Sequence, residues 1–185
     1  MLNNLTALLD SGAAPAVGDY ESIQTVTLGS TQATVVFSSI PSTYKHLQIR
    51  CMARSTFAST TADMYISDTT PSSTTTIGYT HILRGNGTAA AAQNYSGIIE
   101  VARESLSGST AGASIFNAVI IDLLDYTDTN KRSTYRALSG VDLNGSGTVA
   151  FQSGSQAKTL ATSQLTLSCD GSFAQYSSFA LYGVK

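Results

Sequence analysis

Charge is scarce in this sequence. Only 12% of its 185 residues are Asp, Glu, Lys or Arg, and the net charge is −2. No run of basic residues is present, so the sequence predicts no nucleic-acid partner. No apolar stretch approaches the roughly 18 residues that cross a bilayer, and residues 1–10 contain no Lys or Arg. The sequence therefore predicts neither a membrane partner nor a signal peptide.

Cysteine and histidine are almost as rare. Cys51 and Cys169 lie far apart, each at an apolar position of an alternating segment, and we expect two buried thiols rather than a disulfide. His46 and His81 also lie in alternating segments, and the chain contains neither His-Glu-x-x-His nor Gly-x-Ser-x-Gly. We therefore expect no catalytic residue, no metal and no cofactor.

Two groups of acidic residues were considered as calcium ligands. Residues 142–146 resemble the start of a calcium loop, and Asp122, Asp125 and Asp128 precede them at intervals of three. No later Glu supplies the bidentate ligand that such a loop needs. Turn chemistry explains residues 142–146 better, because Asp and Asn bond local backbone and Gly allows a positive φ.

Glu100 and Glu104 were considered as the paired carboxylates of a glycosidase. Arg103 stands directly beside Glu104, and this pairing of opposite charges is typical of a solvated strand end. We therefore interpret the two glutamates as surface residues and expect no glycosidase site.

Serine and threonine supply the polarity that charge does not, and together they make up roughly a quarter of the chain. Threonine favours strands, and serine favours turns and edges. Helical surfaces are usually built from Glu, Lys, Arg and Gln instead. The composition therefore favours a β-rich fold.

Apolar and polar residues alternate with a period of two through most of the chain, which is typical of half-buried strands. The expected strands cover residues 20–28, 34–37, 45–53, 62–67, 77–83, 95–102, 114–124, 133–143, 148–151, 164–169 and 173–184. A proline turn at Pro41 separates the second from the third. Short strands at such regular spacing predict a single all-β domain over residues 19–185, an antiparallel β-sandwich of jelly-roll-like form.

Several segments carry more specific expectations. Residues 114–124 are almost continuously apolar, which suits a central strand buried on both faces, with a buried helix as the alternative. Residues 103–112 and 152–158 are expected to be loops, and the alanine run at 88–93 is too short for a secure helix. The aromatic last strand is expected to lie inside its sheet.

Residues 1–18 differ from the rest of the chain. Leu2, Leu5, Leu8 and Leu9 fall on one side of a short helix, and so short a helix needs a surface to be stable. Residues 11–18 are mostly small and are typical of a flexible linker. We interpret residues 1–18 as an arm whose four leucines bind a partner; the alternative is a frayed terminus.

Four stretches resemble small structural proteins of tailed bacteriophages, cyanophages and marine phages among them. They are YESIQTVTLGS (20–30), FSSIPSTYKHLQIR (37–50), IFNAVIIDLLDYTDTNKRSTYRALSG (115–140) and FALYGVK (179–185). The resemblance covers most of residues 20–185 but not the arm. It implies a β-sandwich mounted on a virion, and it leaves open whether the mount is the capsid or the tail.

This resemblance implies a non-enzymatic virion protein, made in the cytoplasm of the host bacterium, that decorates or cements the capsid. Its partners would be the major capsid protein or other virion proteins, and a homo-oligomer is expected, with a trimer favoured because virion jelly rolls often are trimers. The alternative is a tail fibre or receptor-binding module whose loops at 68–76, 85–94 and 103–113 contact a host glycan. An enzyme with an unfamiliar site is the third alternative.

The fold prediction can be checked by far-UV circular dichroism. A spectrum dominated by β-structure is expected, because the alternating segments leave few residues for helix. A helix content near the ~30–35% of an average domain would contradict the sandwich.

Overall fold

The computed structural model describes residues 19–70, 78–97, 99–157 and 159–185. Over these ranges the chain forms twelve strands and no helix. The strands are β1 (Tyr20–Thr27), β2 (Gln32–Phe37), β3 (His46–Ala53), β4 (Thr61–Asp68), β5 (Gly78–Gly85), β6 (Ala90–Ser96), β7 (Ile99–Ser107), β8 (Asn117–Leu124), β9 (Thr134–Asp142), β10 (Gly147–Gln156), β11 (Leu165–Phe173) and β12 (Ser178–Val184). The arm lies outside the described residues.

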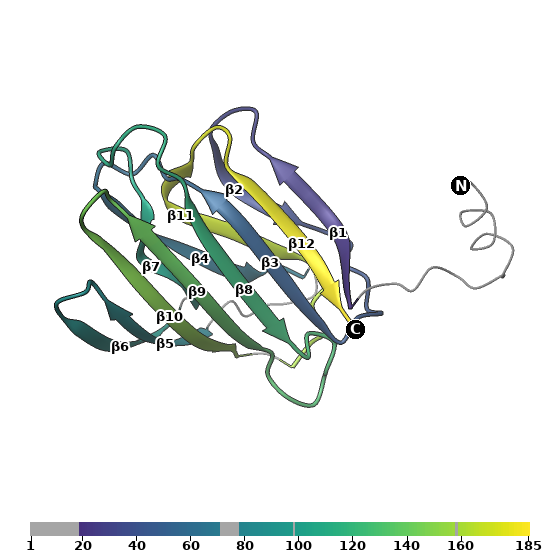
Figure 1. The fold of residues 1–185 in the computed structure, drawn as a ribbon. Coiled ribbons are helices and arrows are strands. Elements are labelled where there is room, and N and C mark those ends of the chain that lie inside the picture. The colour runs from purple at the N-terminus through teal and green to yellow at the C-terminus, as the bar shows by residue number, and fades with distance from the viewer. Residues whose placement is uncertain (1–18, 71–77, 98, 158) are drawn as a thin grey trace, which may run out of the picture.

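The strands form two antiparallel sheets that face each other (Figure 1). The large sheet has the order β1-β12-β3-β8-β9-β10-β5-β6, and the small sheet has the order β2-β11-β4-β7. The chain crosses between the sheets at eight connections: β1 to β2, β2 to β3, β3 to β4, β4 to β5, β6 to β7, β7 to β8, β10 to β11 and β11 to β12. These crossings give β1-β12-β3-β8 opposite β2-β11-β4-β7, which is the strand order of a jelly roll. The predicted all-β sandwich is therefore confirmed.

Two insertions widen the large sheet beyond this jelly-roll core. The β5–β6 hairpin is inserted between β4 and β7, and the β9–β10 hairpin between β8 and β11. Both add their strands to the β8 side of the large sheet, which therefore becomes twice as wide as the small one (Figure 1). The small sheet can cover only half of it.

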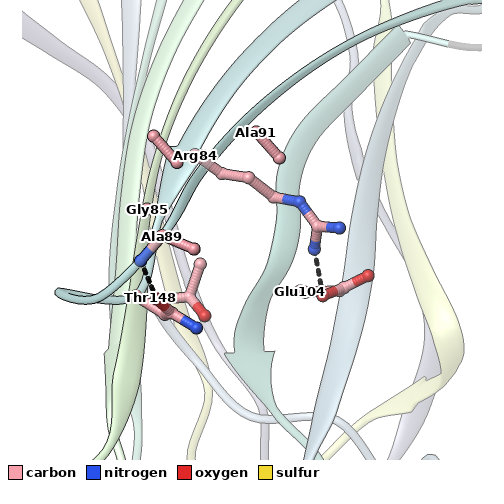
Figure 2. Close-up of a pocket in the computed structure, with 8 residues that line it drawn as sticks. Arg84, Gly85, Ala89, Ala91, Glu104 and Thr148 are labelled. Atoms are coloured by element: carbon pink, nitrogen blue, oxygen red, sulfur yellow. Dashed lines mark hydrogen bonds and ion pairs between the residues drawn. The ribbon is translucent and has the colours of Figure 1, made fainter.

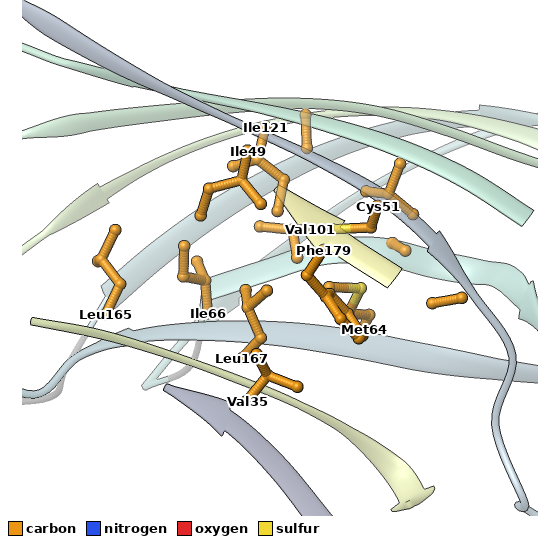
Figure 3. Close-up of a cluster of buried hydrophobic side chains, with 14 of the residues drawn as sticks. Val35, Ile49, Cys51, Met64, Ile66, Val101, Ile121, Leu165, Leu167 and Phe179 are labelled. Carbon is orange, nitrogen blue, oxygen red and sulfur yellow. The ribbon is translucent and has the colours of Figure 1, made fainter. Parts of the chain in front are cut away.

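The core fills the space between the two sheets. Side chains of the large sheet, such as Ile49, Ile121 and Phe179, meet Met64 and Leu167 of the small sheet (Figure 3). Phe173 and Phe179 are fully buried and pack edge to face, with their ring centroids 4.8 Å apart. Burying each such side chain contributes roughly 1.5–3 kcal/mol, so the two apolar faces hold the sandwich together.

Strand β7 is one of the two edge strands of the small sheet. It is covered by the extension of the large sheet, which consists of β9, β10, β5 and β6. The Glu100 amide donates to Thr80 Oγ1 at 3.2 Å, which joins β7 to β5. A Cβ on Gly78 would lie 2.2 Å from Ile99 Cγ1, so only glycine allows this approach. The curled extension therefore shields an edge that would otherwise expose unpaired backbone groups.

The proline turn between β2 and β3 is confirmed and is held by an aromatic pair. The fully buried Tyr126 donates its hydroxyl hydrogen to the carbonyl of Pro41, and the Tyr44 amide donates to that hydroxyl oxygen at 3.4 Å. The Tyr44 ring lies over Gly183, where a Cβ would come within 2.3 Å of it. The turn is therefore locked to the C-terminal strand β12.

The interior position of the last strand and the state of the cysteines are also confirmed. Strand β12 pairs with β1 on one side and with β3 on the other. Cys51 and Cys169 are both free and buried. Burial raises the pKa of the Cys169 thiol to about 11, so it stays protonated at neutral pH.

Four local expectations were wrong. Strand β8 is central, but it alternates, and Ile120 is 41% exposed, so only one of its faces is buried. Strand β7 continues to Ser107 and β10 to Gln156, where loops were expected. The expected strand 95–102 is split at Gly97, whose φ of 108° makes a turn between β6 and β7. In each case pairing with a neighbouring strand outweighs local composition.

Truncation of the core should destabilise the fold strongly. Phe179→Ala removes a fully buried ring from a strand that is paired on both sides, and a loss of about 3–5 kcal/mol in the free energy of unfolding is expected. Urea denaturation measures it. Phe57→Ala is the matched control, because this ring is 42% exposed and its loss should change stability little. Equal losses in the two variants would contradict the described core.

Candidate functional site

The outer face of the large sheet carries a continuous band of exposed apolar side chains. In one row across the sheet, Ile120 on β8 is in register with Leu138 on β9, Leu138 with Phe151 on β10, and Phe151 with Leu83 on β5. Met52 and Val149 lie in the next row, Met52 beside Ala118 and Val149 between two glycines, Gly140 and Gly85. These six side chains, from 41% to 61% exposed, are called the apolar band: Met52, Leu83, Ile120, Leu138, Val149 and Phe151.

Strand β10 is inverted relative to an ordinary sandwich strand. Its large apolar residues Val149 and Phe151 point outward, whereas Gln152 and Gln156 are buried in the interior. Gln156 accepts a hydrogen bond from the buried hydroxyl of Tyr135 at 2.9 Å. Apolar side chains normally occupy the covered face of a strand, so β10 carries its large apolar residues on the face opposite to the usual one.

Two hollows flank the central residue of the apolar band, Leu138. The β3 hollow, of about 340 Å³, lies toward β12 and is lined by Met52, Ala118, Ile120 and Ala180 among others. The β5 hollow, of about 320 Å³, lies on the opposite side and is lined by Leu83, Gly85, Ala90, Val149 and Phe151 among others. The face therefore offers both protruding apolar side chains and apolar depressions.

Polar side chains border the apolar band and are fixed by one another. Gln48 Nε2 donates to Asp122 Oδ1 at 2.8 Å, and Arg50 Nε donates to Gln48 Oε1 at 2.7 Å. The Arg50 guanidinium lies over the rings of Tyr20 and Tyr182, at 5.3 and 4.8 Å from their centroids. The border is thus an ordered polar rim beside an apolar centre.

A second polar cluster lies on the small sheet. Asp63 on β4 and Glu100 on β7 lie beside Arg103, and Asp170 on β11 lies beside Asp63; we call these four residues the carboxylate cluster. Arg103 pairs with Asp63 and lies 3.4 Å from Glu100 Oε1. The Asp63 amide donates to Asp170 Oδ2 at 3.1 Å, and the Tyr65 hydroxyl donates to Asp170 Oδ1 at 2.9 Å. The cluster therefore joins three strands of the small sheet.

Electrostatics make this cluster sensitive to pH. Burial raises the pKa of the Asp63 carboxyl, although the Glu104 amide and Arg103 act against the shift. Burial also raises the pKa of Glu100, again against Arg103. Glu100 Oε2 is buried and accepts no hydrogen bond from the described residues. The negative form of Glu100 is therefore disfavoured in the folded protein.

The expectation that Arg103 and Glu104 form a solvated strand end was wrong. Both lie within strand β7, and the Arg103 side chain is only 22% exposed. Glu104 has a φ of 47° at an irregular point of the β4–β7 pairing, which turns its side chain toward Arg84, with which it forms an ion pair. Glu100 and Glu104 therefore share Arg103 as a partner, and Glu104 also pairs with Arg84.

A pocket of about 250 Å³ lies beside that ion pair, at the tip of the β5–β6 hairpin (Figure 2). It is lined by Arg84, Asn86, Ala91, Glu104 and Thr148 among others. Guanidinium, amide, carboxylate and hydroxyl groups thus face one small space. Such groups can hydrogen-bond a polar ligand.

The other candidate residues do not converge. Strands β8, β9 and β10 separate β3, which carries His46, from β5, which carries His81. His46 Nδ1 accepts a hydrogen bond from the Asp125 amide at 3.0 Å. The Asp122 carboxylate accepts a hydrogen bond from Gln48, and the Asp128 carboxylate accepts one from the Asn130 amide. The Asp125 carboxylate pairs with Lys131, so the three aspartates have separate partners.

Residues 142–146 form a turn, as their composition indicated. Asp142 Oδ1 accepts a hydrogen bond from the Asn144 amide at 2.8 Å, and Asn144 and Gly145 both have positive φ values. Within the described residues, no group of three or more His, Cys, Asp or Glu side chains is placed to hold a metal ion. Nor do the described segments include a helix of the length and apolarity that a membrane span requires.

The apolar band and the carboxylate cluster were not found from the sequence. The sequence did contain one indication of the apolar band. Leu138 and the charged Arg136 are two residues apart in an alternating strand, so both lie on its outer face. Asp63 and Asp170 are 107 residues apart in the chain, and nothing local indicates that they meet. Comparison of the chain with protein-family models, curated proteins and solved structures finds no match.

The raised pKa of Glu100 predicts a pH-dependent cost to stability. The folded state keeps the proton at pH values where the unfolded chain has lost it, so stability falls as pH rises from 4.5, the ordinary glutamate value, through the raised folded pKa. Relative to Glu100→Gln, the wild type should therefore lose free energy of unfolding across this window. Urea denaturation at several pH values measures the difference.

Glu21→Gln serves as the control for that experiment, because this side chain is 46% exposed at the edge of the sheet. Its difference from wild type should change less with pH. A Glu100→Gln difference that is constant from pH 4.5 upward would contradict the assignment.

Proposed function

We propose that this chain is a non-enzymatic structural protein of a phage virion, which decorates or cements the capsid through its N-terminal arm and its sandwich body. Its partners are the major capsid protein or other virion proteins. It is made in the host bacterial cytoplasm and ends in the virion. The resemblance of residues 20–185 to phage structural proteins supports this proposal, and the jelly-roll strand order agrees with it.

The apolar band is the observation that carries the proposal. Monomeric proteins rarely leave large contiguous apolar patches exposed, and such patches mark surfaces that contact other molecules. The apolar band is broad and lies on the open face of a sheet, whereas a small-molecule site is concave. A protein that works by assembly needs such a face.

The way the arm joins the body also supports attachment. Strand β1, which follows the arm, is the outermost strand of the large sheet. The Lys185 amide donates to the carbonyl of Asp19 at 3.1 Å, and Lys185 Nζ lies 3.8 Å from Glu21 Oε2. The root of the arm is thus fixed to the body.

The pocket beside Arg84 favours a second candidate, a tail fibre or receptor-binding module that contacts a host glycan. It adjoins residues 85–89, within one of the loops expected to contact a glycan, and the polar groups of Arg84, Glu104 and Thr148 in its lining can hydrogen-bond sugar hydroxyls. Copy number per virion discriminates the two functions, since a decoration protein is present in many copies and a tail protein in few. Binding to host cell-wall glycans would favour the tail.

Deletion of residues 1–18 should abolish capsid attachment and leave the body folded. Burial of each leucine contributes roughly 1.5–3 kcal/mol, so Leu2, Leu5, Leu8 and Leu9 together supply several kcal/mol of docking after the cost of ordering is subtracted. The Leu5→Asp, Leu8→Asp double variant should act in the same way, because it buries charge. Melting temperature and binding to capsids that lack the protein are the measurements.

A matched variant, Asn3→Asp with Asn4→Asp, adds the same charge to the arm and leaves the leucines in place. It should bind capsids nearly as well as the wild type. If the truncated protein still binds at the normal stoichiometry, the arm is a frayed terminus and attachment runs through the body.

A further inference from the structure

The chemistry of the apolar band restricts what can cover it. Across the strands, the apolar band spans four spacings of ~4.8 Å, and along the strands it spans two rows that each occupy about 7 Å. These dimensions give it a footprint of roughly 300 Å². That is the apolar centre of a protein interface, which typically buries about 800 Å² on each side and is surrounded by a polar rim. The ordered side chains of Gln48, Arg50 and Asp122 supply such a rim on the same face.

The charges of the rim favour neither an acidic nor a basic partner. Arg50 and Arg136 are balanced by Asp122 and Asp142 on the outer face. A strongly acidic or strongly basic partner would find no surface of opposite net charge on this face. A partner surface with a similar mixture of positive and negative side chains can pair with the charges of the rim. A second copy of this chain has that mixture.

The shape of the face is complementary to itself. Each side of Leu138 carries protruding side chains and a hollow: Leu83, Val149 and Phe151 with the β5 hollow on one side, and Met52 and Ile120 with the β3 hollow on the other. A twofold rotation about an axis near Leu138 brings the protrusions of each copy over the hollows of the other. In an isologous interface the same surface of each copy meets the other. That surface must therefore contain both the protruding side chains and the hollows that receive them.

We infer that the outer face of the large sheet is a homodimer interface, in which the apolar bands of two copies pack face to face around a twofold axis near Leu138. The inverted strand β10 then has both of its faces covered, Gln152 and Gln156 by the small sheet and Val149 and Phe151 by the partner copy. The inference rests on the proposed function only for the premise that the apolar band contacts protein.

The same observations speak against the expected trimer. A threefold ring needs two different surfaces that fit each other. The remaining large apolar side chains exposed among the described residues are scattered over the small sheet, the connections and the far end of the large sheet: Tyr20, Val36, Phe57, Tyr79, Leu160 and Tyr176. They provide no second apolar surface for the apolar band to meet.

Sedimentation equilibrium of the purified chain over the micromolar range tests the inference without any virion component. The wild type should dimerise, and Leu138→Glu should raise the dissociation constant about thirtyfold or more, because it places a charge at the interface centre. Val149→Glu, at the most exposed residue of the apolar band, should act likewise and guards against a folding defect in the first variant. Circular dichroism checks that both remain folded.

Val36→Glu is the matched control. Val36 is 42% exposed but lies on the small sheet, so the variant should dimerise like the wild type. Equal mixing of Leu138→Glu with Leu138→Lys should restore a dimer, because the two residues face each other near the axis.

A wild-type chain that stays monomeric, or an oligomer that both band variants leave intact, overturns the inference. Binding to capsids is measured separately, with the variant that lacks residues 1–18. A dimer that is absent from the capsid refutes the proposed function alone, and a monomer that binds capsids refutes the dimer alone.

Discussion

The structure depends on one geometric constraint: a four-stranded sheet has to cover a sheet of eight strands. Over β12, β3 and β8 the small sheet buries the inner face, and there the interior is a dense apolar core with Phe173 and Phe179 at its centre. Beyond β8 the large sheet has no full partner sheet. It curls onto the edge strand β7 instead, and Gly78 allows the two backbones to approach.

The uncovered half of the sheet explains the unusual placement of side chains there. Its inner face holds small and polar residues, among them Ser139, whose hydroxyl lies 2.6 Å from that of Ser105, and the Tyr135–Gln156 pair. The inner face also holds the buried Ile82 and Val141, whereas most large exposed apolar residues of these strands lie in the apolar band. A sheet gains stability when its apolar face packs against another surface, and the small sheet packs only against the inner face. The proposed assembly role and the proposed dimer both place a protein surface against the outer face.

The carboxylate cluster holds the small sheet together at the point where strand β7 is irregular. Strand β7 is irregular at Glu104, and the Glu104 amide at that irregularity donates to Asp63 Oδ1 at 2.7 Å. Arg103 holds Asp63 and Glu100 and also lies 5.0 Å from the ring centroid of Tyr95 on the β5–β6 hairpin. The cluster thus links the small sheet to the curled extension. Its burial makes Asp63 and Glu100 harder to ionise, which is the physical cost of that link.

The sequence by itself determined the fold class, most strand positions, the proline turn and the turn at Asn144, because alternation and turn residues act through neighbouring residues. It also determined that β12 is an interior strand and that the thiols of Cys51 and Cys169 are buried. Only the tertiary structure decided where β7 and β10 end, which face of β8 is exposed, and that Val149 and Phe151 point outward. It alone brought Asp63 to Asp170 and aligned Ile120, Leu138, Phe151 and Leu83 in one row. The reason is that strand register and sheet width are set by pairing between distant segments, which leaves no trace in local pattern.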